Sequence, residues 1–212
     1  MVAIILGLWV ISACAFIQDK EEVLSAPELL QKGVKKSKKG YLIEATSAFQ
    51  QVLEDYPDSK ERVKALLLLA RAHYSNEEYE EAKFHFRKFT ELYPAHRQTD
   101  RAYFYGVMSD YKRIDLAQRD QTYTQEALEG FKQLITRFPK SRYLNDAQIK
   151  KQECETALAK NIFEIGKFYF RTGSYQPAIT RFKNLMGEYP NQKFQGEAVF
   201  LIAESYYHEQ NF

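Results

Sequence analysis

Residues 82–94 read Ala-Lys-Phe-His-Phe-Arg-Lys-Phe-Thr-Glu-Leu-Tyr-Pro, and they carry the spacing that decides the fold. An Ala is followed four residues later by a Phe, and an aromatic–Pro pair ends eight residues after that Phe. Because residues four apart share one face of a helix, the Ala admits a neighbouring helix, the Phe fills the space beside it and the Pro ends the helix. The spacing occurs four times, at Ala45, Phe49 and Tyr56-Pro57; Ala82, Phe86 and Tyr93-Pro94; Ala127, Phe131 and Phe138-Pro139; and Ala178, Phe182 and Tyr189-Pro190.

A small residue precedes each copy and indicates a second helix that packs closely against the first. It lies twelve residues before the Ala in three copies, at Gly33, Ala70 and Gly166, and Gly106 is the candidate in the remaining copy. The pattern resembles the tetratricopeptide repeat, in which each unit of about 34 residues is an antiparallel pair of helices. The resemblance covers nearly all of the chain after residue 26, and it implies an all-α helical solenoid of about four and a half repeats.

Two halves are expected along this solenoid. We predict an N-terminal half at 26–141, with repeats 1–3 and a polar insertion near 115–123, and a C-terminal half at 142–212. The second half should begin with one long helix, roughly 142–171, and continue with repeat 4 and an incomplete repeat 5. In that last helix Ala203 takes the small position, and Val199, Ile202 and Tyr206 would lack a partner helix. Solenoids normally end in a polar cap, so we expect either a truncated chain or a partner that covers this end.

The first thirteen residues are apolar throughout, and a helix of that length is too short for a bilayer, which takes about 20 residues. We therefore predict a signal peptide at 1–13 and a tether at 14–25. The residues Ile11-Ser12-Ala13-Cys14 resemble the lipobox of bacterial lipoproteins, which implies palmitate on Cys14 and, because Ala15 follows, sorting to the outer membrane. The alternative is a buried N-terminal helix with an incidental cysteine, since the usual basic segment before the apolar core is missing.

Composition and motifs argue against catalysis. The 30 Lys and Arg nearly balance the 28 Asp and Glu, so nucleic acid is not an expected partner. The sequence has no phosphate-binding loop, zinc-protease helix, nucleophile elbow or calcium loop, and Cys14 and Cys154 have no metal-ligand neighbours. His73 and His85 fall on opposite helices of the second repeat, where packing is the expected role. We predict a protein that is not an enzyme and needs no metal or cofactor.

Several segments together resemble the BamD family of outer-membrane assembly lipoproteins, and they run in the order of that family. They are Tyr93-Pro94-Ala95-His96, Asp100-Arg101-Ala102-Tyr103-Phe104-Tyr105-Gly106, Arg119-Asp120, Phe138-Pro139-Lys140-Ser141-Arg142-Tyr143 and Asp146-Ala147. Two residues depart from the family pattern, Arg97 in place of Pro and Tyr105 in place of Arg. The resemblance implies a subunit of the β-barrel assembly machinery, lipid-anchored at the periplasmic face of the outer membrane. Its implied partners are a POTRA domain of the BamA-type barrel protein, other assembly lipoproteins and nascent outer-membrane proteins.

A peptide groove is the expected functional site, because stacked helix pairs form a concave surface lined by the first helix of each pair. The repeat phase places six residues there, Leu67, Arg71, Tyr74, Tyr103, Val107 and Asp110, although ordinary packing between repeats would also explain them. Rings and a cation suit an aromatic-rich segment that ends in a carboxylate. The family resemblance adds Arg181 as the residue that contacts the BamA-type partner, since Arg forms bidentate pairs with carboxylates.

Other readings remain open from the sequence. Periplasmic repeat scaffolds of the Tol or cell-division type share the spacing, but they usually add an N-terminal coiled coil, and no heptads occur between Asp19 and Pro27. A pilus-assembly lipoprotein would also carry repeats behind a lipobox, without the Tyr-Pro-x-His and Asp-Arg-x-Tyr segments. A peptidoglycan-active enzyme is the alternative of a different class.

Overall fold

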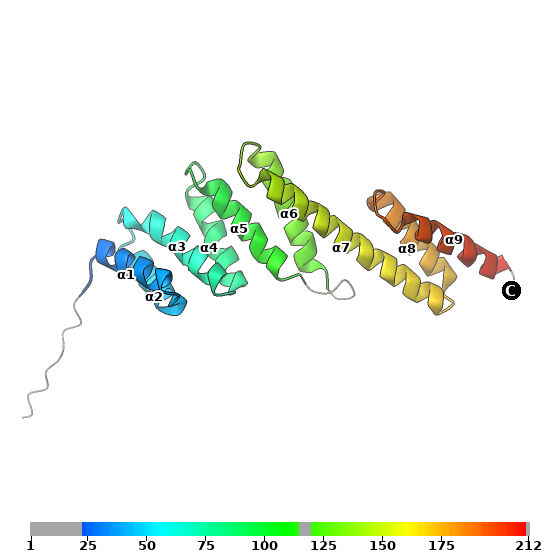
Figure 1. Ribbon diagram of the computed structural model, residues 1–212, viewed down its shortest axis with the longest axis horizontal. Helices are drawn as coiled ribbons and strands as arrows, with labels where there is room; N and C mark the ends of the chain where they lie inside the picture. The colour runs from blue at the N-terminus through cyan, green and yellow to red at the C-terminus, as the bar shows by residue number, and fades with distance from the viewer. Residues whose placement is uncertain (1–22, 115–119, 211–212) are drawn as a thin grey trace, which may run out of the picture.

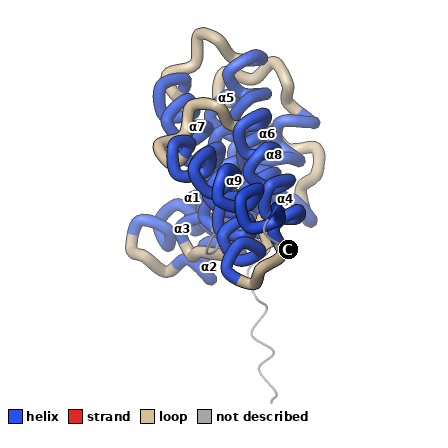
Figure 2. The backbone as a smooth tube through the Cα atoms, turned by 90° about the vertical axis from the view of Figure 1, so that its right-hand side faces the viewer, coloured by secondary structure: helices blue, strands red, loops and turns tan. Residues whose placement is uncertain are grey.

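The computed structural model describes residues 23–114 and 120–210, which contain helices and no strand. The helices form one row from α1 to α9 (Figure 1), and the view along the row shows them stacked behind one another (Figure 2). This arrangement confirms the predicted all-α solenoid. The helices are α1 Ala26–Lys38, α2 Leu42–Asp55, α3 Glu61–Ser75, α4 Tyr79–Leu92, α5 Thr99–Lys112, α6 Thr122–Arg137, α7 Leu144–Arg171, α8 Tyr175–Glu188 and α9 Gln195–Gln210.

The repeated Ala and Phe residues form the contacts that the spacing predicts. All four Ala residues are fully buried, and the four Phe side chains are at most 1% exposed. A Cβ built on Gly33 would lie 2.5 Å from the ring of Phe49, and one built on Gly166 would lie 2.6 Å from the ring of Phe182. These two positions must therefore be glycine for the ring to reach its place, which confirms the close helix approach.

The third repeat differs from the prediction by one residue. A Cβ on Gly106 would have Phe86, of the preceding repeat, as its nearest neighbour at 3.4 Å. The residue of α5 that faces α6 is Val107, and the room for it comes from Gly130, whose added Cβ would lie 2.6 Å from the Val107 side chain. One residue turns a helix face by 100°. In this pair the small residue is thus on the second helix, α6, whereas in the other repeats it is on the first helix.

A second regular spacing, of small residues after each repeat Pro, lets each repeat pack closely against the one before it. Ala65, Ala102, Ala147 and Ala198 each follow a repeat Pro by eight residues, and all are fully buried. Seven residues later come four more small buried residues, Ala72, Ser109, Cys154 and Ser205. These residues pack against the Phe side of the preceding repeat, as Ala102 does beside Phe86 and Phe89. The sequence carries this signal as a regular spacing of small residues after each repeat Pro.

The long helix predicted at roughly 142–171 is confirmed as α7, which has 28 residues. Its first half packs on α6 through Ala147 and Cys154, while Gly166 in its second half meets Phe182 of α8. The face of the first half where a second helix would lie is polar, and Lys151 and Glu155 form an ion pair there at 2.7 Å. No further helix is needed on this face.

The equivalent face of α9, on which the second helix of a repeat would pack, is apolar. Among the described residues, no helix covers it. Val199 on this face is 50% exposed, and Ala203, predicted as the small position, is exposed as well. The prediction of unpartnered residues on this helix is therefore confirmed for Val199. Ile202 packs partly against the α7–α8 core, and the hydroxyl of Tyr206 accepts a hydrogen bond from Nζ of Lys183 on α8 at 2.8 Å.

Several predicted features fall at or beyond the limits of the described residues. The signal peptide, Cys14 and tether residues 14–22 lie outside them, as do residues 115–119 of the predicted insertion. Thr122 and Tyr123, assigned to that insertion, instead form the first turn of α6. Within residues 23–114 and 120–210, no helix combines the length and the apolar character that crossing a bilayer requires.

His73 and His85 stack across the second repeat, as their places on opposite helices suggested. Their ring centroids lie 5.2 Å apart with planes tilted by 7°, and Nδ1 of His73 lies 2.6 Å from Oε2 of Glu78. Nδ1 of His85 is buried and lacks a hydrogen-bond partner. Burial, together with the charges of His73 and Lys88 and against that of Glu81, lowers the pKa of His85 to about 4.

Stability should therefore fall in mild acid. The folded pKa of His85 lies below the unfolded value of about 6.5, so its contribution is complete above pH 6.5 and is lost as the pH falls toward 4. After allowance for partial solvent access, we expect a loss of about 1–2 kcal/mol between pH 7 and pH 4.5 from this group. Urea titrations of wild type and His85→Phe at both pH values measure it; an unchanged pH dependence in the variant contradicts the assignment.

Candidate peptide-binding surfaces

The six residues predicted for one groove lie in two places. Leu67, Arg71 and Tyr74 follow Pro57 by ten, fourteen and seventeen residues. The residues at the same distances from Pro94 are Phe104, Met108 and Tyr111, one position beyond the predicted Tyr103, Val107 and Asp110. The prediction of a single inner face is therefore wrong: the three α3 residues and the three α5 residues point in different directions, because a shift of one residue rotates a side chain by 100°. Leu67 itself belongs to the core and is 5% exposed.

Arg71 and Tyr74 belong to a surface that we call the arginine–tyrosine face, formed with Arg101 and Tyr105 of α5 and with Arg142 and Tyr143 before α7. The ring of Tyr105 lies 5.2 Å from that of Tyr74 and 6.1 Å from that of Tyr143. The guanidinium groups lie over these rings, Arg101 at 5.7 Å from Tyr105 and Arg142 at 4.8 Å from Tyr143. Three segments far apart in the sequence thus bring three cations and three phenols together.

The charge of the arginine–tyrosine face is only partly compensated, because the pKa of Arg142 is raised by its hydrogen bond to the Tyr143 hydroxyl and by the nearby carboxylate of Asp100. Among the described residues, none of its three arginines forms an ion pair with a carboxylate. Burial and the like charge of Arg101 lower the pKa of Arg71, and Nε of Arg101 is buried without a hydrogen-bond partner. Burial also raises the pKa of Tyr74 to about 12, so its phenol stays protonated and can donate a hydrogen bond. A carboxylate is the ligand that this arrangement favours.

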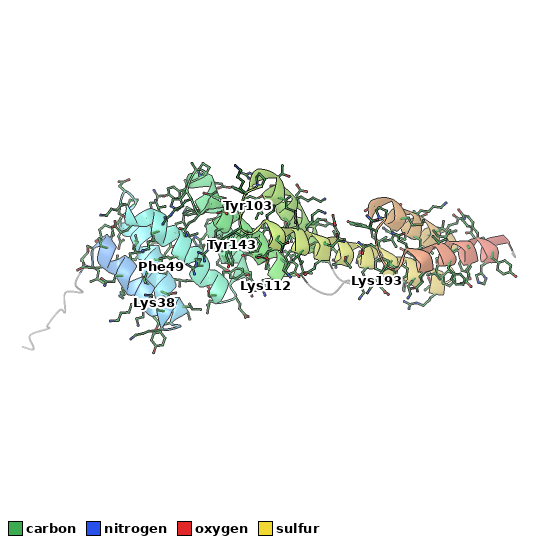
Figure 3. The ribbon with its side chains drawn as sticks, turned by 45° about the horizontal axis from the view of Figure 1, so that its top comes forward. Lys38, Phe49, Tyr103, Lys112, Tyr143 and Lys193 are labelled. Atoms are coloured by element: carbon green, nitrogen blue, oxygen red, sulfur yellow. The ribbon has the colours of Figure 1, made fainter. Side chains whose placement is uncertain are left out.

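Tyr103, Val107 and Asp110 line a different surface, which we call the α4–α6 groove. It has a volume of about 790 Å³ and runs between α4 and α6 with α5 as its floor. The hydroxyl of Tyr103 donates to Oε1 of Gln133 at 2.7 Å, and the guanidinium of Arg137 lies 5.3 Å from the Tyr103 ring. In Figure 3 the labels Tyr103 and Tyr143 mark the two surfaces.

A bridged pair of carboxylates closes one end of the α4–α6 groove. Nζ of Lys83 lies 2.7 Å from Oδ1 of Asp110 and 2.7 Å from Oε2 of Glu126. Burial raises the pKa of Asp110 despite Lys83, because only 6% of its side chain is exposed. Burial also opposes the charge on Lys83, but hydrogen bonds to both carboxylates outweigh it and raise the lysine pKa. The lysine thus keeps a buried carboxylate compensated.

Arg181, the predicted partner contact, lies on α8 three residues after the buried Ala178. Its side chain is exposed, and it forms no ion pair among the described residues. It therefore lies on α8, which contributes no residue to either of the two surfaces described above. Four further residues of the arginine–tyrosine face were not predicted as site residues from the sequence: Arg101, Tyr105, Arg142 and Tyr143. The segments that contain them are among those that carry the family resemblance.

Comparisons with known proteins agree with this architecture. The family model described as "YfiO: Outer membrane lipoprotein" matches residues 23–211. The outer membrane protein assembly factor BamD of Caulobacter vibrioides is 28% identical over 84% of this chain and 58% of its own length. BamD of Xylella fastidiosa strain Temecula1 is 26% identical over 92% of this chain and 70% of its own, and BamD of Rickettsia prowazekii 26% over 96% and 81%. The chain thus spans little more than half the length of the Caulobacter relative.

A solved structure supports the fold alone. The "TPR2AB-domain:pHSP90-complex of yeast Sti1" has a TM-score of 0.51 at 16% identity, covering 88% of this chain and 78% of the other. Sequence spacing, the stacked helices and a family match over 23–211 all lead to one assignment. The chain belongs to the YfiO/BamD family of outer membrane lipoproteins.

Proposed function

We propose that this chain is a non-enzymatic subunit of the β-barrel assembly machinery, anchored through Cys14 at the periplasmic face of the outer membrane. The family match and relatives named as outer membrane protein assembly factors support this role. The N-terminal half, 26–141, binds unfolded outer-membrane proteins. The C-terminal half, 142–212, binds a POTRA domain of the BamA-type barrel protein. Other assembly lipoproteins complete the complex, and neither cofactor nor metal takes part.

The arginine–tyrosine face is the observation that carries the substrate part of this proposal. Its arginines, which form no ion pair among the described residues, suit the C-terminal carboxylate of an outer-membrane protein, because charge-assisted hydrogen bonds to a guanidinium are about twice as strong as neutral ones. The partly exposed rings of Tyr74 and Tyr105 offer apolar contact to the aromatic side chains that precede such a carboxylate, and the buried ring of Tyr143 supports Tyr105 from behind. The rest of the unfolded chain can extend over the solenoid.

Charge reversal on this face should weaken peptide binding. We expect Arg71→Glu with Arg101→Glu to lower the affinity for a fluorescent peptide ending in Tyr-x-Phe and a free carboxylate by at least about tenfold, since two charge-assisted contacts become repulsive. Fluorescence anisotropy measures the dissociation constant. Amidation of the peptide should weaken its binding to wild type in the same way.

The matched control is Lys132→Glu with Arg171→Glu, which changes the net charge equally at two exposed positions away from the face. This control should bind the free peptide as wild type does. Equal binding of the free and amidated peptides by wild type would refute the carboxylate role.

Arg181 provides the test of the partner. With tagged full-length protein extracted in detergent from its native membrane, we expect a BamA-type barrel protein to co-purify with wild type and to be reduced at least about tenfold with Arg181→Glu. Arg171→Glu serves as the control at another exposed arginine. Recovery of Tol, cell-division or pilus-assembly proteins in place of the barrel protein would overturn the assembly role and leave the repeat scaffold intact.

A further inference from the structure

The turn between α1 and α2 shares its backbone conformation with two other turns of the row. The three turns are centred on residues with a positive φ: Gly40, Glu77 and Gly173. In each turn the next N–H group donates to a carbonyl five residues earlier, at 3.1 Å for Tyr41, 3.0 Å for Glu78 and 2.9 Å for Ser174. This hydrogen bond closes the helix end. Each turn therefore holds that residue in the same place, whatever its side chain is.

The α1–α2 turn exposes two large side chains that the fold does not require. Tyr41 is 52% exposed and Ile43 is 71% exposed, and neither belongs to the core clusters around α1 and α2. The equivalent residues, four and two positions before the repeat Ala, are polar in the other two turns: Glu78 and Glu80, and Ser174 and Gln176. The repeat pattern thus allows polar side chains at these positions, and only the first repeat presents an aromatic ring and a branched aliphatic chain there.

Lysines surround this turn on its α1 side. They follow one another at helical spacing along one face of α1, with one more beside them: Lys32, Lys35, Lys36 and Lys39, and Lys38. Among the described residues, only Lys36 pairs with a carboxylate, Oε1 of Glu44 at 3.9 Å, and its Nζ lies 5.1 Å from the centre of the Tyr41 ring. The labelled Lys38 lies at the outer edge of the first helix pair (Figure 3). Positive charge and exposed apolar surface therefore occur together at this turn.

The basic surface is confined to the first helix pair. The next turn, between α3 and α4, is acidic, with Glu80 paired to Arg113 at 2.8 Å and Glu78 lying 2.6 Å from His73. Two helix spacings of about 8–10 Å separate the turns, roughly twice the Debye length of about 8 Å in physiological salt. The acidic turn therefore leaves the lysines attractive to anions. It also favours an orientation in which the α1–α2 turn meets a negative plane first.

We propose that this turn contacts the surface of an anionic lipid bilayer. The contact surface, which we call the basic tip, consists of Lys32, Lys35, Lys36, Lys38, Lys39, Tyr41 and Ile43. The lysines attract lipid phosphates, while Tyr41 and Ile43 enter the headgroup region, where an amphipathic ring is favoured. Lysine is depleted at protein–protein interfaces, whereas at a fluid anionic surface each flexible ammonium adds its own attraction. This contact adds to the lipid proposed on Cys14 and does not depend on it.

A single tryptophan at the tip reports the contact. Trp9 is the only tryptophan of the chain, so Trp9→Phe with Tyr41→Trp carries one reporter, at position 41. The full chain is reconstituted into vesicles of phosphatidylcholine, with or without phosphatidylglycerol, whose acyl chains are brominated near the headgroup. Bromine quenches tryptophan fluorescence on contact. We expect at least about threefold stronger quenching with phosphatidylglycerol than without, and loss of that difference at high ionic strength.

Charge reversal on α1 should remove the contact. Lys35→Glu with Lys39→Glu in the reporter background should lower quenching in the anionic vesicles at least about threefold, since each lysine near an anionic surface raises binding about fivefold. Lys132→Glu with Arg171→Glu makes the same change of net charge at exposed positions away from the tip and should leave quenching unchanged. Helical circular dichroism should be retained in both variants, because all four positions are partly or fully exposed.

The matched reporter is Ser174→Trp in the Trp9→Phe background. It has the equivalent position in the α7–α8 turn, where the same backbone hydrogen bond closes the helix and no lysine cluster precedes it. Its fluorescence should show no dependence on phosphatidylglycerol.

Three results would overturn the proposal. Equal quenching of Tyr41→Trp with and without phosphatidylglycerol would show that the tip does not recognise lipid charge. Unchanged quenching in Lys35→Glu with Lys39→Glu would show that the lysines do not hold the tip at the bilayer. Binding of inorganic polyphosphate to the tip, without quenching in anionic vesicles, would assign the lysines to a soluble polyanion. Because the vesicles contain neither barrel protein nor peptide, failure of the assembly role would leave each of these results unaffected.

Discussion

Replacing Phe182 by alanine should lower the free energy of unfolding by about 3–5 kcal/mol, because the ring is fully buried between α7 and α8 and a cavity would remain. Its ring lies against Gly166 and 5.7 Å from the ring of Phe163, so no neighbouring side chain fills the space without strain. In a solenoid each repeat contacts only its neighbours, so a loss in one repeat stays largely local. Amide hydrogen exchange should therefore show the loss of protection mainly in α8 and α9.

Gly166, which faces Phe182 from α7, provides the control. Gly166→Leu places a side chain where an added Cβ would already be 2.6 Å from the Phe182 ring, so alone it should also destabilise α7–α8. Combined with Phe182→Ala it fills the cavity from the other helix, as Val107 does opposite Gly130. We expect the double variant to be more stable than the sum of the single changes by at least about 1 kcal/mol in urea unfolding. Additive losses would contradict the size complementarity between residues 166 and 182.

Lys83→Met should lower the free energy of unfolding by about 2–3 kcal/mol at pH 8, because it removes the cation that compensates the buried Asp110. The value lies below that of a fully buried pair, since Lys83 is 33% exposed and Glu126 45% exposed. Without Lys83 the folded pKa of Asp110 rises further above its unfolded value. The penalty should therefore shrink as the pH falls through that folded pKa.

Two comparisons isolate this effect in urea titrations at pH 8 and pH 5. Asp110→Asn in the Lys83→Met background should recover most of the loss, because no buried charge remains. Lys150→Met removes a lysine that pairs with the exposed Glu153 at 2.8 Å and should cost less than about 1 kcal/mol. If Lys83→Met proves as mild as Lys150→Met, burial does not make the Asp110 carboxylate dependent on Lys83.

The residue pattern alone was enough to determine the helix pairs. Each Pro of the four copies stands within two residues beyond the end of a helix, and each Ala and Phe of the pattern is buried. These features are local, since periodicity and helix termination depend on neighbours within one or two turns. The turn at Glu77, with φ of 62°, was not predictable in this way, because Glu is not a typical residue for the conformation that Gly40 and Gly173 adopt in the equivalent turns.

The tertiary structure alone decided which side chains meet. The sequence placed the small residue of the third repeat at Gly106, and that shift of one residue assigned Tyr103, Val107 and Asp110 to the wrong face of α5. The rotation of α5 is set by Val107 against Gly130, two residues on different helices, so no local pattern encodes it. The arginine–tyrosine face likewise exists only because α3, α5 and the start of α7 stack side by side. Local periodicity fixed the helices, and packing between them fixed the surfaces, because one residue of register turns a side chain by 100°.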